Sequence, residues 1–379
     1  MTDASSTRAP LNWPAIIMFL LSTIPVVTVF PWYAATFGFD GFEWACFFVL
    51  WALNGLSITA GYHRLWAHRS YEASKPLQIF FMLFGAMALQ NSILVWSSSH
   101  RNHHRYVDDV DQDPYSAKRG LWFSHLGWML RNYESGRPDF RNAKDLEANP
   151  IVRFQHKYYL PLALAMNFGI PVLLGVLHGN LWGSLLLAGF LRLVVSHHCT
   201  FFINSLAHYW GSRPYTTENT ARDNGVLALF TWGEGYHNYH HLFQWDYRNG
   251  IRWYQWDPTK WLIRACTWLG LARALKRVPE FQIRQALVQR QLQKVEENLG
   301  QIQDTSRLAA LRQSLETEMQ HYKETLAHWA ALQQKRVEAA KKAVIDHIEH
   351  NEILQRVREL EESLRQQYLR VRLIAVQVA

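Results

Sequence analysis

Cysteine and charge are both scarce in this chain of 379 residues. The three cysteines, Cys46, Cys199 and Cys266, form no CxxC pair, which excludes a disulfide scaffold, a zinc ribbon and a protein-bound iron–sulfur cluster. Charged residues make up only 18%, whereas 49% of the residues are hydrophobic and 17 are tryptophan. This composition indicates a membrane protein rather than two or three soluble domains.

Proline and charge are also unevenly distributed. Residues 281–379 contain no proline, a single tryptophan and 28 of the 70 charged side chains. Residues 1–280 contain all 13 prolines and carry 24 Lys/Arg against 18 Asp/Glu, a net charge of +6. We therefore expect an all-α fold: a membrane domain over 1–280, with a transmembrane bundle and a His-rich cap, and a charged, coiled-coil-like tail over 281–379.

Three long runs lack charged residues, and a spanning helix needs about 20 apolar residues. The third run contains the turn-like His178-Gly179-Asn180, which predicts a helical hairpin. No signal-peptide pattern precedes the first run. The predicted spans are residues 14–36, 43–61, 158–177 and 181–203.

Basic residues predict the orientation of these spans. The link between the first two spans and the turn at 178–180 contain no Lys or Arg. We therefore expect both termini and the active site to be cytoplasmic, in the inner membrane if bacterial or the endoplasmic reticulum if eukaryotic. A fifth uncharged run, 76–99, is expected to be a helix on or re-entering the cytoplasmic face, because a span there would place the basic segment 100–157 outside.

Histidines form clusters with helical spacing. Positions i, i+3 and i+4 share one face of a helix, whereas His63 and His68 diverge by about 140° on an ideal helix unless it loosens after Gly61. Nine imidazoles and an amide are too many for a closed structural zinc site and suit two metal ions with open positions. Imidazole ligands alone allow iron, copper, zinc or nickel. The clustered residues are His63, His68, His100, His103, His104, Asn204, His208, His237, His240 and His241.

Several stretches resemble the integral-membrane fatty acid desaturases of the acyl-CoA Δ9 (stearoyl-CoA) type, over about residues 10–275. They are Ile58-Thr-Ala-Gly-Tyr-His-Arg-Leu-Trp-Ala-His-Arg-Ser-Tyr71, Asn204-Ser-Leu-Ala-His208, Gly233-Glu-Gly-Tyr-His-Asn-Tyr-His-His241 and Asp246-Tyr-Arg-Asn-Gly250. The resemblance implies that the nine clustered histidines bind two iron ions and that Asn204 acts through a water. It also implies that O2 and two electrons convert a CH2–CH2 pair of a fatty acyl chain into a cis double bond.

Substrate contacts also follow from the resemblance. Gln90, Trp96 and Thr200 match residues of the acyl tunnel, and Phe201 replaces the family's tryptophan. Lys118 and Arg119 match basic contacts to the coenzyme A headgroup. Ser98-Ser99 replaces an Arg-Asp pair that contacts this headgroup in the family. A coenzyme A thioester is therefore favoured, with an acyl-phospholipid or carrier-protein substrate left open.

The chain contains no Rossmann fingerprint, haem motif or cytochrome b5-like module, so we expect a separate electron donor. A ferredoxin, a rubredoxin or a cytochrome b5 type of carrier would suit the basic cytoplasmic face. No nucleic-acid partner is expected. Two alternatives remain: a fatty acyl hydroxylase on the same scaffold, and a membrane scaffold that acts through its tail.

Three polar residues and the tail complete the predictions. His125 is expected to be structural, His197 to line the tunnel or pair with a neighbouring helix, and Arg192 to be functional or buried with a partner. Two tail helices are predicted, about 280–299 and 306–372. Their apolar seam includes residues 308, 311, 315, 319, 322, 326 and 329 and continues through Val344, Ile348, Val357, Leu360, Leu364 and Val371. Self-association of the tail, packing on the body and binding of a partner all remain open.

Overall fold

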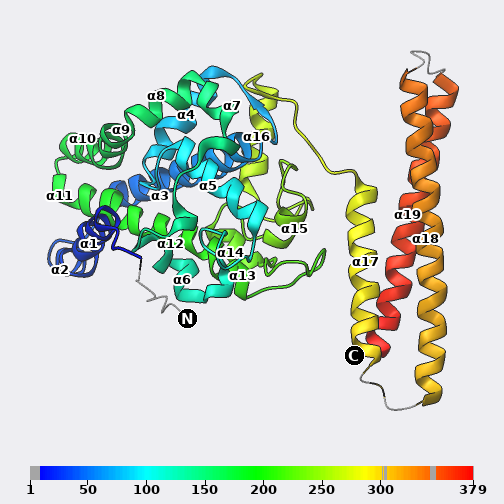
Figure 1. Ribbon diagram of the computed structural model, residues 1–379. Helices are drawn as coiled ribbons and strands as arrows, with labels where there is room; N and C mark the ends of the chain where they lie inside the picture. The colour runs from blue at the N-terminus through cyan, green and yellow to red at the C-terminus, as the bar shows by residue number, and fades with distance from the viewer. Residues whose placement is uncertain (1–8, 301, 303–304, 342–346, 379) are drawn as a thin grey trace, which may run out of the picture. The chain divides into compact units, whose positions relative to one another are not determined.

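A computed structural model describes residues 9–300, 302, 305–341 and 347–378, without the side chains of 305 and 336–351. The described chain is mostly helical, with one two-stranded sheet, and forms two compact units (Figure 1). One unit comprises Met1–Arg213 with Asn219–Arg277, and the other Pro214–Glu218 with Val278–Ala379. The predicted all-α class is confirmed, whereas the division into a membrane domain over 1–280 and a tail over 281–379 stays a prediction.

Four helical segments of the described residues are long and apolar enough to cross a membrane: Trp13–Thr36, Gly41–Ala67, Tyr159–His178 and Leu181–Tyr209. They match the four predicted spans, and the second and fourth continue further than expected. The elements within them are α1 (Trp13–Val27), α2 (Val29–Thr36), α3 (Gly41–Leu56), the π-helix η1 (Ser57–Ala67), α9 (Tyr159–Leu164), η6 (Ala165–Gly169), α10 (Ile170–His178), α11 (Leu181–Ser184), η7 (Leu185–Leu191), α12 (Arg192–Asn204) and α13 (Leu206–Tyr209).

The two connections on the side without basic residues are short and well capped. Asp40 accepts hydrogen bonds from the backbone N–H groups of Phe42 and Glu43, and the Glu43 carboxylate accepts one from the Asp40 N–H. Gly179 ends α10 with a φ of 82°, a left-handed conformation that glycine adopts without strain. These caps let the chain reverse between spans within a few residues.

The fifth apolar run is not one helix. It forms α4 (Lys75–Ala86) and α5 (Ile93–Tyr106), which are separated by an irregular segment. Leu89 and Asn91 in that segment have φ values of 50° and 76°, which a right-handed helix does not allow. The expectation of a single helix over 76–99 was therefore wrong, and the break carries Gln90.

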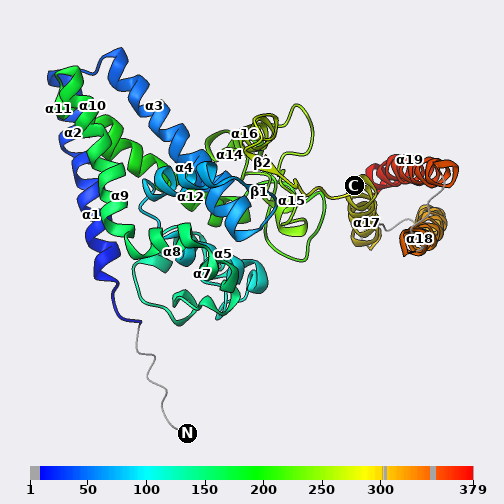
Figure 2. The ribbon, with the colours of Figure 1, turned by 90° about the horizontal axis from the view of Figure 1, so that it is seen from above.

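Short elements complete the unit around a core that includes η1, α4, α5 and α16 (Pro258–Trp268), where Tyr62, Phe81, Ile93 and Ile263 are nearly inaccessible. Figure 2 shows α4, α5 and α16 from above. Strand β1 (Glu72–Ala73) pairs antiparallel with β2 (Ala272–Arg273). The other elements are η2 (Ala117–Arg119), α6 (Leu121–His125), η3 (Gly127–Met129), η4 (Glu134–Gly136), η5 (Phe140–Asn142), α7 (Lys144–Ala148), α8 (Pro150–Lys157), α14 (Gly225–Phe230), α15 (His237–Leu242) and α16 (Pro258–Trp268).

The tail forms α17 (Glu280–Leu299), α18 (Thr305–Lys341) and α19 (His347–Gln377) around its own apolar core. The predicted helix over 306–372 is thus two helices, and Val344 lies outside the described residues. The seam from 308 to 329 packs in this core as predicted, with the Phe281 and Trp329 rings stacked 3.8 Å apart. The Glu318 carboxylate, 2.6 Å from the Arg370 guanidinium, joins α18 to α19.

Candidate metal centre

Nine histidine side chains from four elements converge in the body, and they are the nine that the sequence singled out. The nine histidines form two groups, and each residue offers one ring nitrogen as a ligand atom. Within each group these atoms all lie within 4.8 Å of one another. One group contains His63, His68, His100, His104 and His240; the other contains His103, His208, His237 and His241.

The HxxHH motifs on α5 and α15 each contribute to both groups. On α5, His100 and His104 belong to the first group and His103 to the second; on α15, His240 belongs to the first and His237 and His241 to the second. Inside the groups the Nε2 atoms face one another: His240 lies 2.9 Å from His104, and His237 lies 3.1 Å from His208. The helical i, i+3, i+4 geometry therefore builds two adjacent nitrogen-lined sites.

The pair five residues apart is brought together by a π-helix. In η1 the backbone N–H of His68 donates to the carbonyl of His63 over 3.0 Å, the i+5 pattern of this helix type. The two imidazole rings consequently lie 4.6 Å apart instead of diverging. This decides between the two geometries that the sequence left open, in favour of a helix that loosens around Gly61.

Burial favours the neutral form of six of the clustered imidazoles. It is the largest cause that lowers the pKa values of His68, His100, His104, His237, His240 and His241 well below the usual value, with like-charge repulsion among the rings as a further cause. A neutral imidazole with an unprotonated Nε2 is the form that binds a metal ion. The donor set therefore fits two metal ions.

Each group contains one histidine backed by a buried carboxylate. His63 Nδ1 lies 2.9 Å from Glu234 in the first group, and His103 Nδ1 lies 2.9 Å from Asp113 in the second. Burial alone would raise the pKa of Glu234, but His63 and Arg64 hold it below its ordinary value. Such partners fix the tautomer and orientation of a ligating ring. Sequence reasoning missed both carboxylates, although Glu234 lies only three residues before the first histidine of one HxxHH motif.

Arg64 links Glu234 to other segments of the same unit. Its buried guanidinium lies 2.9 Å from Glu234 and 3.0 Å from Asp257, and it donates to the Tyr247 carbonyl. Asp257 also accepts hydrogen bonds from the backbone N–H groups of Asn249 and Gly250. The arginine next to His63 therefore anchors Glu234 on two distant segments.

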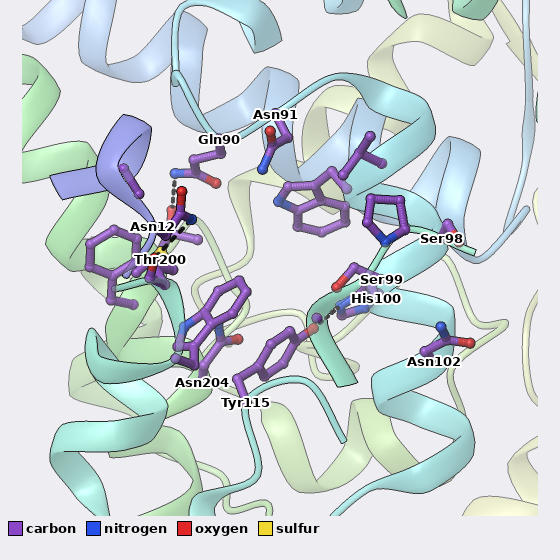
Figure 3. A pocket seen from close by; sticks show the side chains of 18 of the residues that line it. Asn12, Gln90, Asn91, Ser98, Ser99, His100, Asn102, Tyr115, Thr200 and Asn204 are labelled. Atoms are coloured by element: carbon purple, nitrogen blue, oxygen red, sulfur yellow. Dashed lines mark hydrogen bonds between the residues drawn. The ribbon is translucent and has the colours of Figure 1, made fainter. Parts of the chain in front are cut away.

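A cavity of about 460 Å³ adjoins the two histidine groups and is lined by His63, His100 and His237. Figure 3 shows this cavity, with His100 and Asn204 among the labelled side chains. Gln90 donates a hydrogen bond to Thr200 over 3.0 Å, which joins the break after α4 to α12. Trp96 stacks on His100 at 4.9 Å, and Asn204 lines the cavity together with His237. The predicted tunnel residues that line this cavity are Gln90, Trp96, Thr200 and Phe201.

The predicted headgroup residues lie outside the lining of this cavity, and their contact with coenzyme A stays a prediction. Lys118 and Arg119 are exposed and do not line the cavity, and the Arg119 guanidinium stacks 3.6 Å from the Phe123 ring. Arg131 and Arg137 supply the basic lining instead. The Ser98 hydroxyl lies 2.7 Å from the Asp139 carbonyl and 2.7 Å from the Asn142 side chain. Ser98 therefore joins α5 to the segment around η5. Sequence reasoning missed both arginines, since neither belongs to a recognisable motif.

The remaining polar residues have defined partners. His197 lines the cavity and lies 2.8 Å from the carbonyl of Ala88, in the irregular segment after α4, whereas its role in an acyl tunnel stays a prediction. Arg192 is buried with the Asn167 side chain and the Met87 carbonyl, which is the buried-paired alternative. His125 lies 2.9 Å from the Ser205 hydroxyl and 3.0 Å from His198, in keeping with a structural role.

Comparison with known proteins identifies the family. The model of the fatty acid desaturase family matches residues 42–273. The chain is 43% identical over 298 residues to acyl-CoA desaturase 1 of Saccharomyces cerevisiae, covering 77% of this chain and 57% of the relative. It is 44% identical over 286 residues to a probable acyl-CoA desaturase of Schizosaccharomyces pombe (75% and 58%), and 44% identical over 241 residues to human stearoyl-CoA desaturase 5 (62% and 72%).

The chain therefore spans less than two thirds of the length of the two yeast relatives. The matched region contains all four histidine clusters, both carboxylate partners and most of the cavity lining. The family match alone covers more than half of the 379 residues. This chain belongs to the fatty acid desaturase family.

Proposed function

We propose that the protein is an O2-dependent acyl-CoA desaturase that introduces a cis double bond, at Δ9, into a saturated fatty acyl chain. The observation that carries this proposal is that histidines of both groups, His63, His100 and His237, line one cavity, which could receive an acyl chain. The acyl-CoA desaturases among its relatives support the substrate class. Overall, the CH2–CH2 pair, O2, two electrons and two protons give a cis CH=CH and two waters.

The metal proposed for the two histidine groups is iron. Imidazole nitrogen suits several metals, and membership of the family is the reason to prefer iron. When bound, two iron ions would supply the oxidant that an unactivated methylene requires. Glu234 and Asp113 would fix the orientations of the His63 and His103 rings, so that their Nε2 atoms could bind these ions. Asn204 lies on the cavity side of the second group, where it would act through a water.

The chain's own residues would position the substrate. An acyl chain in the cavity would lie between the three lining histidines and the Gln90–Thr200 hydrogen bond. Trp96, stacked on His100, would keep other methylene groups of the acyl chain away from the first histidine group. Arg131 and Arg137 would face the phosphates of coenzyme A, since guanidinium groups bind phosphate with charge-assisted hydrogen bonds. Positioning of one methylene pair is what gives a single product isomer.

The membrane setting and the electron donor belong to the same proposal. We place both termini and the histidine groups on the cytoplasmic side, because the connections at 37–40 and 179–180 carry no basic residue. Electrons would come from a separate ferredoxin, rubredoxin or cytochrome b5 type of carrier that docks on the basic cytoplasmic face.

Expression in a host that lacks its own desaturase tests the function. The proposal predicts that the full chain restores Δ9 monounsaturated fatty acids, and that the His240→Ala variant, expressed at an equal level, does not. Hydroxylated fatty acids in place of unsaturated ones would favour the hydroxylase. Absence of any new fatty acid, from a chain that purifies without metal, would favour a scaffold role.

A further inference from the structure

A tryptophan-rich surface lies on α16 and the loop that precedes it, outside the cavity and the four spans. One face of α16 is buried, with Ile263 and Cys266 in the core of the body. The opposite face exposes Trp261, Arg264 and Trp268, with 43% of Trp261 and 77% of Trp268 accessible. Positions i, i+3 and i+7 share a helix face, so these three side chains form one stripe.

The preceding loop extends this stripe. Trp253 and Tyr254 are 87% and 68% exposed, and the Trp256 ring lies 5.4 Å from the Trp261 ring. We call Trp253, Tyr254, Trp256, Trp261, Arg264 and Trp268 the tryptophan surface. A water-facing surface rarely exposes so many large apolar rings together, so the patch indicates an interaction site.

Contacts of its buried face place α16, the helix that carries the tryptophan surface, against a membrane span. The Thr259 hydroxyl, in the first turn of α16, is hydrogen-bonded to the hydroxyl of Thr59, within the span Gly41–Ala67, over 2.7 Å. Thr259 also donates to the carbonyl of Trp232. The Trp232 ring in turn packs 5.0 Å from Trp51 of the same span. The tryptophan surface is therefore continuous with elements that lie against membrane-spanning residues.

The chemistry of the surface matches the boundary between lipid and water. Tryptophan and tyrosine concentrate at membrane interfaces, where an apolar ring with one polar atom fits the headgroup region. Arg264, between two tryptophans, can bind a phospholipid phosphate while its methylene groups remain in apolar surroundings. Protein interfaces also use Trp and Arg, but contact with a spanning helix favours lipid. We propose that the tryptophan surface is seated in the headgroup region of the bilayer.

Contact of the tryptophan surface with the bilayer would also affect the residues around the first histidine group. Asp257, directly after Trp256, caps α16 by accepting from the Lys260 N–H, and it also lies 3.0 Å from Arg64. Arg64 holds Glu234, which contacts His63. The bilayer would thus support the segment that braces the first histidine group. The proposal requires only that the spans cross a membrane, not that the enzyme is a desaturase.

Environment-sensitive labels test this placement in the full chain. Trp253→Cys and Trp268→Cys are each labelled with a nitrobenzoxadiazole fluorophore and reconstituted in phospholipid nanodiscs, with Asp111→Cys, an exposed loop position, as the control. Lipids brominated high on their acyl chains quench a fluorophore that contacts the interface. We expect blue-shifted emission at both tryptophan positions and at least a twofold greater loss of intensity with brominated lipid than at Asp111→Cys.

Two results would overturn the proposal. Emission and quenching at positions 253 and 268 equal to those at 111 would place the surface in water. A blue shift that arises only on addition of a soluble electron carrier would identify a protein-docking surface instead. Neither readout depends on bound metal or on turnover, so failure of the proposed enzymatic function would leave this test intact. Both positions are exposed, so the substitutions remove no core packing.

Discussion

The rings of His63 and His68 lie 4.6 Å apart because the backbone between them is a π-helix, in which the N–H of His68 donates to the carbonyl of His63. An α-helix would point these two side chains about 140° apart. The π-helix is therefore the local feature that adds both residues to the first histidine group. π-helical turns are rare and occur frequently at functional sites.

Gly61, in the middle of this π-helix, tests its role. A Cβ at this position would lie 2.7 Å from the Cβ of Phe81, which is closer than real contacts allow. We expect Gly61→Ala to shift η1, to cost about 1–3 kcal/mol of stability, and to lower the metal content of the first group. Metal analysis and thermal unfolding of the purified variant measure both effects. Gly136→Ala, where a Cβ meets nothing within 4 Å, should leave both unchanged.

Removal of one ligand from either group should abolish activity. His240→Ala removes an imidazole from the first group and His103→Ala one from the second, and water cannot replace an oriented, basic nitrogen. Asn204→Ala should reduce turnover less, since its proposed link to the metal runs through a water. Product formation per chain measures the effect, and His321→Ala in the tail is the control. Near-normal turnover in either histidine variant would show that the assigned ligands are wrong.

The carboxylate partners allow a matched pair of variants. Glu234→Gln and Asp113→Asn keep the side-chain shape but remove the charge that orients His63 and His103. We expect each to weaken metal binding by about 10–100-fold in its own group. Titration of the metal-free protein with ferrous iron measures this affinity. Glu72→Gln, in an exposed pair with Arg273, should bind iron normally, and equal affinities in all three variants would contradict the orienting role.

The cavity lining predicts which arginines bind the headgroup. Arg131→Ala/Arg137→Ala should raise KM for an acyl-CoA by about fivefold to tenfold, with a smaller change in kcat, because phosphate contacts contribute to binding rather than chemistry. The double variant Lys118→Ala/Arg119→Ala, outside the lining, should change KM less. The opposite ranking would support the assignment made from the sequence. Normal KM values in both double variants would point to another acyl carrier, such as a phospholipid.

Topology is tested by thiol labelling from one side of the membrane. A cysteine at Asp111, in an exposed loop after α5, should react only from the cytoplasmic side. A cysteine at Phe37, which is 65% exposed in the short connection between the first two spans, should react only from the opposite side. Labelling of both positions from the same side would contradict the proposed orientation.

Local spacing explains why the histidine clusters and the spans could be predicted. The positions of His100, His103 and His104 follow from helical geometry, and the four spans follow from long runs without charge. The partners of these histidines could not be inferred, because Glu234 and Asp113 approach their rings only after distant segments have packed. Nothing in the local sequence distinguishes a carboxylate that contacts a ring from a solvated one.

Helix breaks inside apolar or charged runs were also missed. Residues 87–92 contain no charged residue, so the uncharged run 76–99 predicted one helix where positive φ values at Leu89 and Asn91 interrupt it. In the tail, no proline marks the end of α18, and the break falls at residues outside the described chain. Tertiary packing rather than local composition decides such interruptions.

We propose that the protein desaturates an acyl-CoA with two iron ions bound by its two histidine groups. This proposal is tested most directly with purified full-length protein, a saturated C18 acyl-CoA, O2 and a reduced electron carrier, with the product's mass and double-bond position determined by mass spectrometry. We expect purified protein to hold two iron ions per chain and to yield a product that has lost two hydrogens at carbons 9 and 10. A product that gains one oxygen, or iron-loaded protein that leaves the acyl chain unchanged, would contradict the proposal.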